Sequence, residues 1–284
     1  MMTRPVVSAY TLTLGRELYL QRLLESVIRG AIGVTVEHHL CFQGVEPSEA
    51  TMSLLEHHSV EGLRFVVHRW DENVGNALGQ DRILRELEGD LIARFDDDAQ
   101  LLGPGFFRKL VAAHRLMPGA VLHAFPVGLV RTVGGMPALE RVLAYDDALD
   151  LWFTYRRVEL VGGLARSGPG DLLRTFRFLD DRGIGHSGNE TRQFADQCEA
   201  AGVAMYILEN GLVAEHQETS MGQFARLGRA YFATTNEEAH EPRGWRRAAR
   251  RVLPPVLFDA TKAARRRLAM RDREAQSQPR RVGS

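Results

Sequence analysis

The sequence has no long apolar run and little cysteine. No stretch approaches the roughly 18 consecutive apolar residues of a membrane-spanning helix, and Met1 to Pro5 lead into a strand-like segment without an apolar signal region. Cys41 and Cys198 lie far apart, and neither has neighbours at metal-ligand spacing. A disulfide framework or structural zinc site is therefore not predicted. These absences favour a protein of the reducing cytoplasm over a secreted or integral membrane protein.

The chain also lacks net charge, since 36 Lys and Arg balance 36 Asp and Glu. This balance hides an asymmetry, because residues 241–284 carry a net charge of +9 and residues 1–240 a net charge of −9. We expect no nucleic-acid binding by the acidic body, whereas the basic tail is a candidate for contact with an anionic surface. The composition, 44% hydrophobic and 25% charged over 284 residues, is typical of a globular protein with one or two domains.

The first hundred residues alternate between strand-like and helix-like segments. Strands are expected at Pro5–Tyr10, Val34–Phe42, Leu63–His68 and Asp90–Phe95. Three strand–helix repeats that end in a strand predict an α/β fold with a mostly parallel sheet and helices on both faces. Ligands bind beyond the carboxyl ends of such strands. The polar residues expected at those ends are Tyr10, Gln43, Asn73 and the triplet Asp96–Asp98.

The second half of the chain has a less regular pattern. Helices are expected at 105–116 and 191–201, and strands at 205–208 and 212–214. Between residues 121 and 160 strand candidates mix with aromatic-rich turns, and the pattern assigns no elements there.

Three adjacent carboxylates, Asp96, Asp97 and Asp98, follow directly after the apolar strand that ends at Phe95. Neighbouring carboxylates repel one another unless a cation compensates their charge, and Mg²⁺ and Mn²⁺ take oxygen ligands of this type. An acidic turn that caps the next helix is the alternative for such a triplet. Its position at the end of a central strand favours a divalent cation able to hold a diphosphate.

Several segments together resemble the family-two type of glycosyltransferases, which have the nucleotide-sugar-binding α/β fold called GT-A. These segments are, in chain order, Val6–Tyr10, Asn73–Ala77, Gly89–Asp90 with the strand into Asp96–Asp98, Gly162–Ser167, Gly188–Glu190 and Val213–His216. Their order and spacing make the match specific. The resemblance implies one GT-A-like domain at 1–240, with a donor half at 1–100 and an acceptor half at 101–240. A basic helical tail with a disordered end is expected at 241–284.

The resemblance implies inverting transfer of a sugar from a nucleotide-diphospho-sugar, with UDP the expected nucleotide, to an acceptor hydroxyl. Glu190 is expected to act as general base, and the metal ion, Mn²⁺ or Mg²⁺, to be held by Asp98, Asp96 and His216. The residues expected to contact the donor are Ala9, Tyr10, Gln43, Asn73, Gly75, Asp96 and Asp97. The expected partners are this donor and an acceptor that is a sugar, a glycan, a lipid-linked molecule or a small molecule.

The sequence departs from the family pattern at three places. Gln43 stands where the family usually has Asp or Asn, Gln80-Asp81 where it has Arg-Asn, and Asn189-Glu190 where Glu-Asp is common. These departures leave a non-catalytic nucleotide-sugar-binding protein open as an alternative. A nucleotidyltransferase is another, although the segment Thr11 to Gly15 lacks the glycine-rich basic loop of that class and only Arg16 follows it.

Some candidate residues also have structural interpretations. A first-turn glutamate such as Glu190 stabilises a helix N-terminus, in which case Asp180 and Asp181 are the next candidates for the base. A lone histidine at a strand end, such as His216, is commonly structural. The aromatic cluster at 152–155 fits either an acceptor-stacking surface or the core.

Residues 245–253 of the tail place apolar side chains at helical spacing and arginines on the opposite face, until Pro254-Pro255 ends the segment. Basic amphipathic helices of this kind lie on anionic membrane surfaces. One expectation is therefore peripheral attachment to the inner face of the membrane. Packing of the helix on the acidic body is the other.

Overall fold

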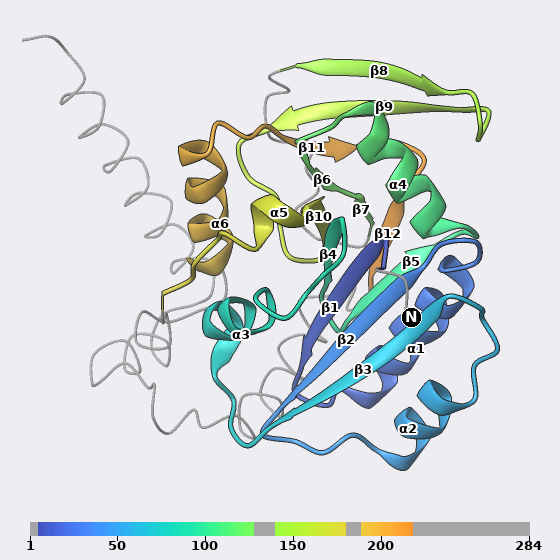
Figure 1. Ribbon diagram of the computed structural model, residues 1–284, viewed down its shortest axis with the longest axis vertical. Helices are drawn as coiled ribbons and strands as arrows, with labels where there is room; N and C mark the ends of the chain where they lie inside the picture. The colour runs from blue at the N-terminus through green and yellow to red at the C-terminus, as the bar shows by residue number, and fades with distance from the viewer. Residues whose placement is uncertain (1–4, 128–139, 180–188, 218–284) are drawn as a thin grey trace, which may run out of the picture. The chain divides into compact units, whose positions relative to one another are not determined.

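The computed structural model describes residues 5–127, 140–179 and 189–217, which belong to one compact unit (Figure 1). The predicted tail at 241–284 and the carboxylates Asp180 and Asp181 lie outside the described residues. Within these ranges no helix is both long enough and apolar enough to cross a membrane.

Three strand–helix repeats open the chain, as the hydrophobic spacing predicts. The strands are β1 (Val7–Thr13), β2 (Val36–Gln43), β3 (Leu63–Trp70) and β4 (Leu91–Phe95). The helices between them are α1 (Glu17–Gly30), α2 (Glu49–Glu56) and α3 (Gly75–Ile83). Helix α2 begins after Ser48, whose hydroxyl accepts a hydrogen bond of 3.0 Å from the backbone N–H of Thr51.

Further strands and three helices follow in the described residues. They are β5 (Ala99–Leu102), α4 (Phe106–Leu116), β6 (Val121–His123), β7 (Phe125–Val127), β8 (Arg141–Asp146), β9 (Leu151–Val158), β10 (Ala165–Pro169), α5 (Gly170–Leu173), α6 (Asn189–Ala200), β11 (Met205–Leu208) and β12 (Val213–His216). The helices predicted at 105–116 and 191–201 and the two late strands are all present. The stretch that the pattern left unassigned contributes β6 to β9.

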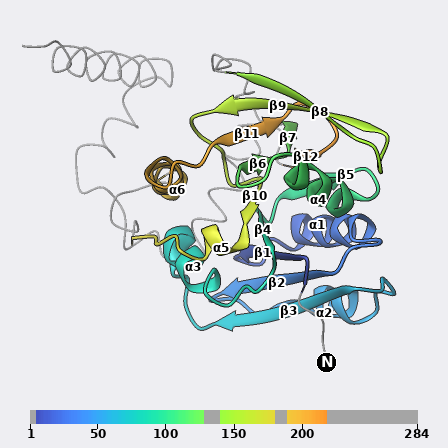
Figure 2. The same cartoon turned by 45° about the horizontal axis from the view of Figure 1, so that its top comes forward.

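The described residues form a nine-stranded sheet with the strand order β3-β2-β1-β4-β10-β6-β11-β9-β8, and Figures 1 and 2 show it in two views 45° apart. Only β10 and β9 run opposite to the other strands of this sheet. The predicted mostly parallel sheet is therefore confirmed. A second, three-stranded sheet has the order β5-β12-β7 and joins the segment after the Asp triplet to the last described strand.

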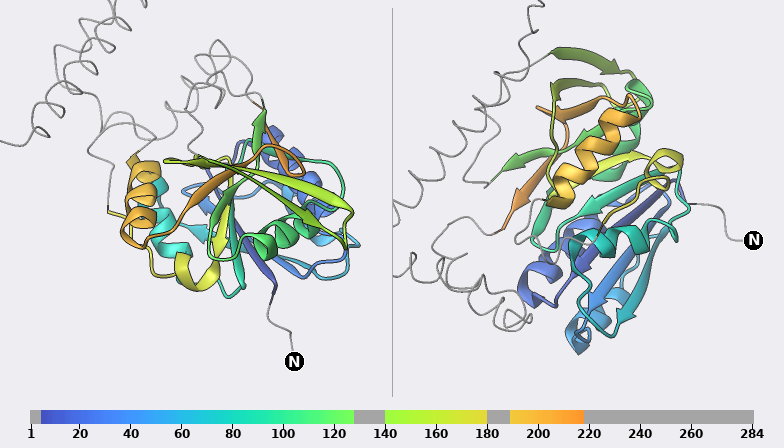
Figure 3. Two further views of the ribbon diagram at one scale, coloured as in Figure 1. Left: turned by 90° about the horizontal axis from the view of Figure 1, so that it is seen from above. Right: turned by 90° about the vertical axis from the view of Figure 1, so that its left-hand side faces the viewer.

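Helices cover both faces of the large sheet, and each face has its own hydrophobic core (Figure 3). Helices α1, α2 and α4 supply the first core, and α3, α5 and α6 supply the second. Strand β1 serves both cores by the alternation of its side chains, because Val7 and Ala9 belong to the first core and Tyr10 and Leu12 to the second. The predicted α/β layering is confirmed.

One detail differs from the sequence-based expectations, and one open alternative is decided. Strand β1 continues three residues beyond Tyr10, because Thr11 to Thr13 remain paired with Leu40 to Phe42 of β2. Tyr10 therefore lies inside the strand, and Thr13 occupies its carboxyl end. Of the two interpretations of the aromatic cluster at 152–155, the core holds for Phe153 and Tyr155, which are buried.

Candidate functional site

The carboxyl ends of the parallel strands carry most of the predicted site. Gln43 is the last residue of β2, Asn73 follows β3, and Asp96 follows β4 directly. Because these strands are parallel, their carboxyl ends meet at one edge of the sheet. The loop from Thr13 to Arg16 lies at the same edge, between β1 and α1.

Asp97 is buried and held by the β1–α1 loop. Its Oδ2 accepts a hydrogen bond of 2.8 Å from the Thr13 hydroxyl, and its Oδ1 accepts one of 3.1 Å from Nε of Arg16. Nη2 of Arg16 also contacts Oδ1. Thr13 and Arg16 are functional candidates that the sequence reasoning missed, since both contacts span more than 80 residues of chain.

Asp98 lies between an arginine and a histidine. Its Oδ2 is 2.9 Å from Nη2 of Arg16 and 3.4 Å from Nε2 of His216. The second sheet brings His216 there, because β12 pairs with β5 and sets His216 opposite Ala99. Burial raises the pKa of the Asp98 carboxyl to about 6, although Arg16 opposes the shift.

Asp96 pairs with a different arginine. Its Oδ1 accepts a hydrogen bond of 2.8 Å from Nη2 of Arg94, and its side chain is 32% exposed. Its crowded surroundings would raise the pKa of this carboxyl, but the Arg94 and Arg166 guanidiniums outweigh that effect and lower it. Asp96 is thus a carboxylate that both faces solvent and is tied to a strand arginine.

The predicted metal ligands are brought together only in part. Within the described ranges no three His, Cys, Asp or Glu side chains form a group that could hold a metal ion. Asp98 and His216 do converge, whereas Asp96 is engaged by Arg94. Two ligands about 2.1 Å from one cation lie roughly 3.0–3.4 Å apart at right or tetrahedral angles. The 3.4 Å separation of Asp98 Oδ2 and His216 Nε2 therefore fits a divalent ion whose other ligands come from diphosphate and water.

Glu190 is buried in the first turn of α6. Its Oε1 accepts a hydrogen bond of 3.3 Å from the Thr191 hydroxyl. Its charge also reaches the strand arginines, because together with Asp96 it raises the pKa of Arg94, and it opposes the burial that lowers the pKa of Arg166 to about 10. The structure therefore brings the predicted base into the electrostatic neighbourhood of Asp96.

A row of polar side chains crosses four strands beside Asp96. Tyr10 of β1 pairs with Arg94 of β4, Arg94 pairs with Arg166 of β10, and Arg166 pairs with His123 of β6. All four residues are buried. Two arginines directly opposite each other repel, so their burial requires compensating partners.

Gln80 is one of those partners. Its Oε1 accepts hydrogen bonds from the Tyr10 hydroxyl, at 3.1 Å, and from Nη2 of Arg166. The Arg166 guanidinium also lies 3.8 Å from the centre of the Phe194 ring of α6. Gln80 stands where the resembled family has Arg, and a cation from β10 lies against it. An arginine within the apolar run of β4 was the sequence signal that could have identified Arg94.

Nη1 of Arg94 and of Arg166 is buried, and neither atom makes a hydrogen bond to the described part of the chain. Unpaired buried donors are costly unless water or a ligand satisfies them. Gly163 lies against the Arg94–Asp96 pair, because a Cβ there would be 2.8 Å from Cζ of Arg94. The Gly162–Ser167 segment thus packs closely on the site, as expected for a glycine at a point of close approach.

The remaining residues expected to contact the nucleotide-sugar donor are Gln43, Asn73, Gly75 and Ala9. Oε1 of Gln43 accepts a hydrogen bond of 3.2 Å from the backbone N–H of Val74, and Oδ1 of Asn73 accepts one of 2.9 Å from that of Gly75. Gly75 has a φ of 82°, which favours glycine. The Ala9 side chain lies in the first core, so any donor contact there falls to its backbone.

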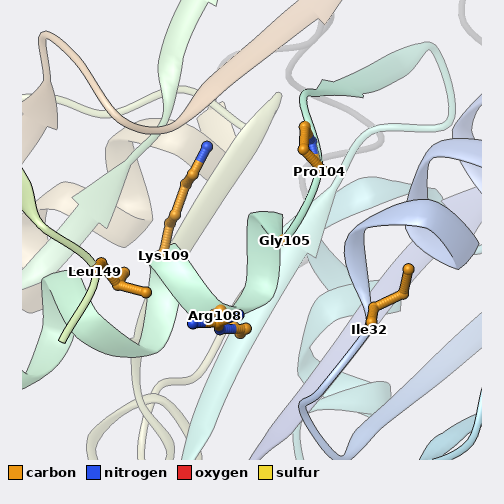
Figure 4. Close-up of a pocket in the computed structure, with 6 residues that line it drawn as sticks. All are labelled: Ile32, Pro104, Gly105, Arg108, Lys109 and Leu149. Atoms are coloured by element: carbon orange, nitrogen blue, oxygen red, sulfur yellow. The ribbon is translucent and has the colours of Figure 1, made fainter.

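A separate cavity of about 280 Å³ lies at the start of α4 (Figure 4). Its lining residues are Ile32, Pro104, Gly105, Arg108, Lys109 and Leu149. None of the predicted site residues lines this cavity.

Comparisons with known proteins find likeness in structure alone. No protein-family model matches the chain, and no curated protein matches it in sequence. The solved structures that are similar to it include GalNAc-T7 with UDP, GalNAc and Mn²⁺, at a TM-score of 0.57 and 14% identity over 78% of this chain and 46% of that one.

Two further structures give the same result. TarS 1–349 of S. aureus in complex with UDP-GlcNAc has a TM-score of 0.53 and 17% identity, over 75% of this chain and 61% of that one. The mannosyltransferase PcManGT of Pyrobaculum calidifontis, with GDP-Man and Mn²⁺, has a TM-score of 0.54 and 16% identity, over 82% and 63%. The chain spans less than two thirds of the length of each of these three structures. It has the GT-A glycosyltransferase fold.

Proposed function

We propose that this protein transfers a sugar from a nucleotide-diphospho-sugar to an acceptor hydroxyl, with inversion at the anomeric carbon. The observation that carries the proposal is the approach of Asp98 Oδ2 and His216 Nε2, 3.4 Å apart, at the edge where a sheet of this type receives its ligand. The similar structures that contain UDP-GlcNAc, UDP or GDP-Man support a nucleotide-sugar donor. UDP is the nucleotide that we propose.

Asp98 and His216 are the residues that would hold a divalent cation, Mn²⁺ or Mg²⁺. When bound, such an ion stabilises the negative charge of a diphosphate leaving group as a Lewis acid. The presence of Mn²⁺ in two of the similar structures supports this assignment. Asp96, partly exposed and fixed by Arg94, would accept hydrogen bonds from the donor.

Glu190 would take the proton from the attacking acceptor hydroxyl, as a general base. Its burial supports this role, since a water-poor carboxylate can be aimed at one hydroxyl. The unpaired Nη1 atoms of Arg94 and Arg166 are available to donate hydrogen bonds to substrate oxygens beside it. The acceptor is a molecule with a free hydroxyl.

A nucleotidyltransferase is disfavoured by the loop between β1 and α1. That class needs a glycine-rich basic loop for phosphates after the first strand, and in this chain the cation of the loop, Arg16, is paired with Asp97 and Asp98. Attachment of the basic tail, 241–284, to an anionic membrane surface at its cytoplasmic face remains a proposal that the charge distribution supports.

Calorimetric titration of the full chain with UDP and GDP, each with and without Mn²⁺, tests the donor assignment. We expect a nucleoside diphosphate to bind in the micromolar range or tighter with Mn²⁺, and at least tenfold more weakly without it. Proton NMR of the anomeric signal of a product formed with a simple sugar acceptor then tests inversion. Binding of neither nucleotide under either condition would contradict the proposed function.

A further inference from the structure

Arg16 occupies the centre of the acidic loop. Its Nε and Nη2 contact Asp97, and the same Nη2 lies 2.9 Å from Oδ2 of Asp98. The side chain lies across the ring of Tyr19, with its Cζ 5.5 Å from the ring centre. One guanidinium from the loop before α1 thus compensates two adjacent buried carboxylates.

The oxygen that Arg16 contacts is the one that faces His216. Oδ2 of Asp98 is 2.9 Å from Arg16 and 3.4 Å from Nε2 of His216. A cation that binds Asp98 and His216 needs this oxygen as a ligand and would lie next to a positive charge. Coulomb repulsion between the two cations opposes their simultaneous binding.

The position of Arg16 also allows its side chain to move away from Asp98. Its side chain is 20% exposed, whereas the side chains of Asp97 and Asp98 are 6% and 7% exposed. The arginine comes from the loop that precedes α1 and not from a strand of the sheet. Rotation about its side-chain bonds can release Asp98 without any change in the sheet.

We propose that Arg16 is a built-in counter-cation that competes with the divalent ion for Asp98, so that the metal binds together with the nucleoside diphosphate and only weakly before it. This inference rests on the proposed function. In the nucleotide-free protein Arg16 compensates the carboxylates. The negative charges of a bound diphosphate offset the positive charges of Arg16 and of the metal ion. The repulsion between these two cations then no longer opposes binding of the metal. Arg16 is therefore a positioning residue that sets the order of binding.

The test is a Mn²⁺ titration followed by electron paramagnetic resonance, which counts free Mn²⁺ directly and needs no turnover. The full-length protein is compared with two variants. Arg16→Gln removes the positive charge, and Arg16→Lys keeps the charge but loses the contact that Nε and Nη2 make together with Asp97. Arg22→Gln is the matched control, since Arg22 is an exposed arginine of α1. Each protein is titrated with and without saturating UDP.

Without UDP, we expect Arg16→Gln to bind Mn²⁺ at least roughly tenfold more tightly than the parent protein, which is the factor that one charge-assisted hydrogen bond is worth. Arg16→Lys should lie between the two, and Arg22→Gln should match the parent. With UDP the difference should shrink. If Arg16→Gln misfolds, a tighter Mn²⁺ affinity of Arg16→Lys relative to the parent carries the same conclusion.

Equal or weaker Mn²⁺ binding by both Arg16 variants without UDP overturns the competition. If the parent then still binds Mn²⁺ in the presence of UDP, the metal assignment at Asp98 and His216 stands and only the role of Arg16 is lost. If no protein binds Mn²⁺ even with saturating UDP, the metal part of the proposed function fails as well. The two failures are therefore distinguishable in one experiment.

Discussion

Two neighbouring parts of the acidic loop are neutralised by arginines of different kinds. Asp97 and Asp98 are held by Arg16, a loop residue whose side chain is 20% exposed. Asp96 is held by Arg94, a residue inside β4 whose side chain is 5% exposed. Arg94 lies inside a strand of the sheet, whereas Arg16 comes from the loop before α1. The comparison separates a carboxylate paired with a buried strand arginine, Asp96, from Asp98, whose loop arginine is the proposed competitor of a metal ion.

The largest effect is expected at Glu190, which interacts electrostatically with Arg94, the partner of Asp96. Glu190→Gln keeps the size of the side chain but cannot take a proton, so turnover should fall about 10²–10⁴-fold while donor affinity persists. A coupled assay of nucleotide release with a verified acceptor measures the first quantity, and calorimetry measures the second. Glu199→Gln, an exposed position on the same helix, is the control. Turnover of Glu190→Gln within a few fold of the parent would assign Glu190 to the helix N-terminus alone.

The two arginines themselves should differ in what they contribute to stability. Arg94→Met leaves Asp96 without its partner and should lower the free energy of unfolding by about 3–5 kcal/mol, as for other broken buried pairs. Arg16→Met should cost roughly 1–2 kcal/mol, because Asp97 keeps its hydrogen bond from the Thr13 hydroxyl and Asp98 keeps His216 beside it. Urea denaturation of both variants measures the difference. Equal losses would remove the distinction between a permanent and an exchangeable cation.

A smaller effect concerns His123 at the end of the arginine row. Burial lowers the pKa of His123 to about 4, and Arg166 adds to the shift. The folded protein therefore keeps this histidine neutral while the unfolded chain takes up a proton below pH 6.5, so its contribution lowers stability as the pH falls from 6.5 to 4. His123→Gln should flatten that slope by about 1–3 kcal/mol across the interval. The free energy of unfolding of both proteins is measured by urea denaturation at pH 4.5 and at pH 6.5. An equal change between the two pH values in the parent and in His123→Gln would show that His123 is accessible to protons in the folded state.

Local spacing was sufficient to predict the first half of the fold. The repeats β1 to β4 follow from apolar periodicity and from turn residues close in the sequence, and the helix after Ser48 follows from a capping residue. Strand β10 could not be predicted in the same way. It lies between β4 and β6, and nothing near Gly162 in the sequence indicates which strand it joins.

The same limit applies to the site. The Asp triplet was visible because three carboxylates are adjacent in the chain, and the approach of His216 to Asp98 was implied by the resemblance. Their cations were not visible. Arg16 and Asp97 are 81 residues apart, and Arg166 and Gln80 are 86 residues apart, so both pairings depend on how the strands are ordered in the sheet.

The central claim is that Asp98 supports metal-dependent binding of a nucleoside diphosphate. Thermal unfolding of the full chain with UDP, with and without Mn²⁺, tests it most directly in the parent protein, in Asp98→Asn and in Asp147→Asn, an exposed control. We expect Mn²⁺ with UDP to raise the unfolding temperature of the parent and of Asp147→Asn by several degrees, and to leave that of folded Asp98→Asn unchanged. An undiminished Mn²⁺-dependent shift in Asp98→Asn would contradict the account.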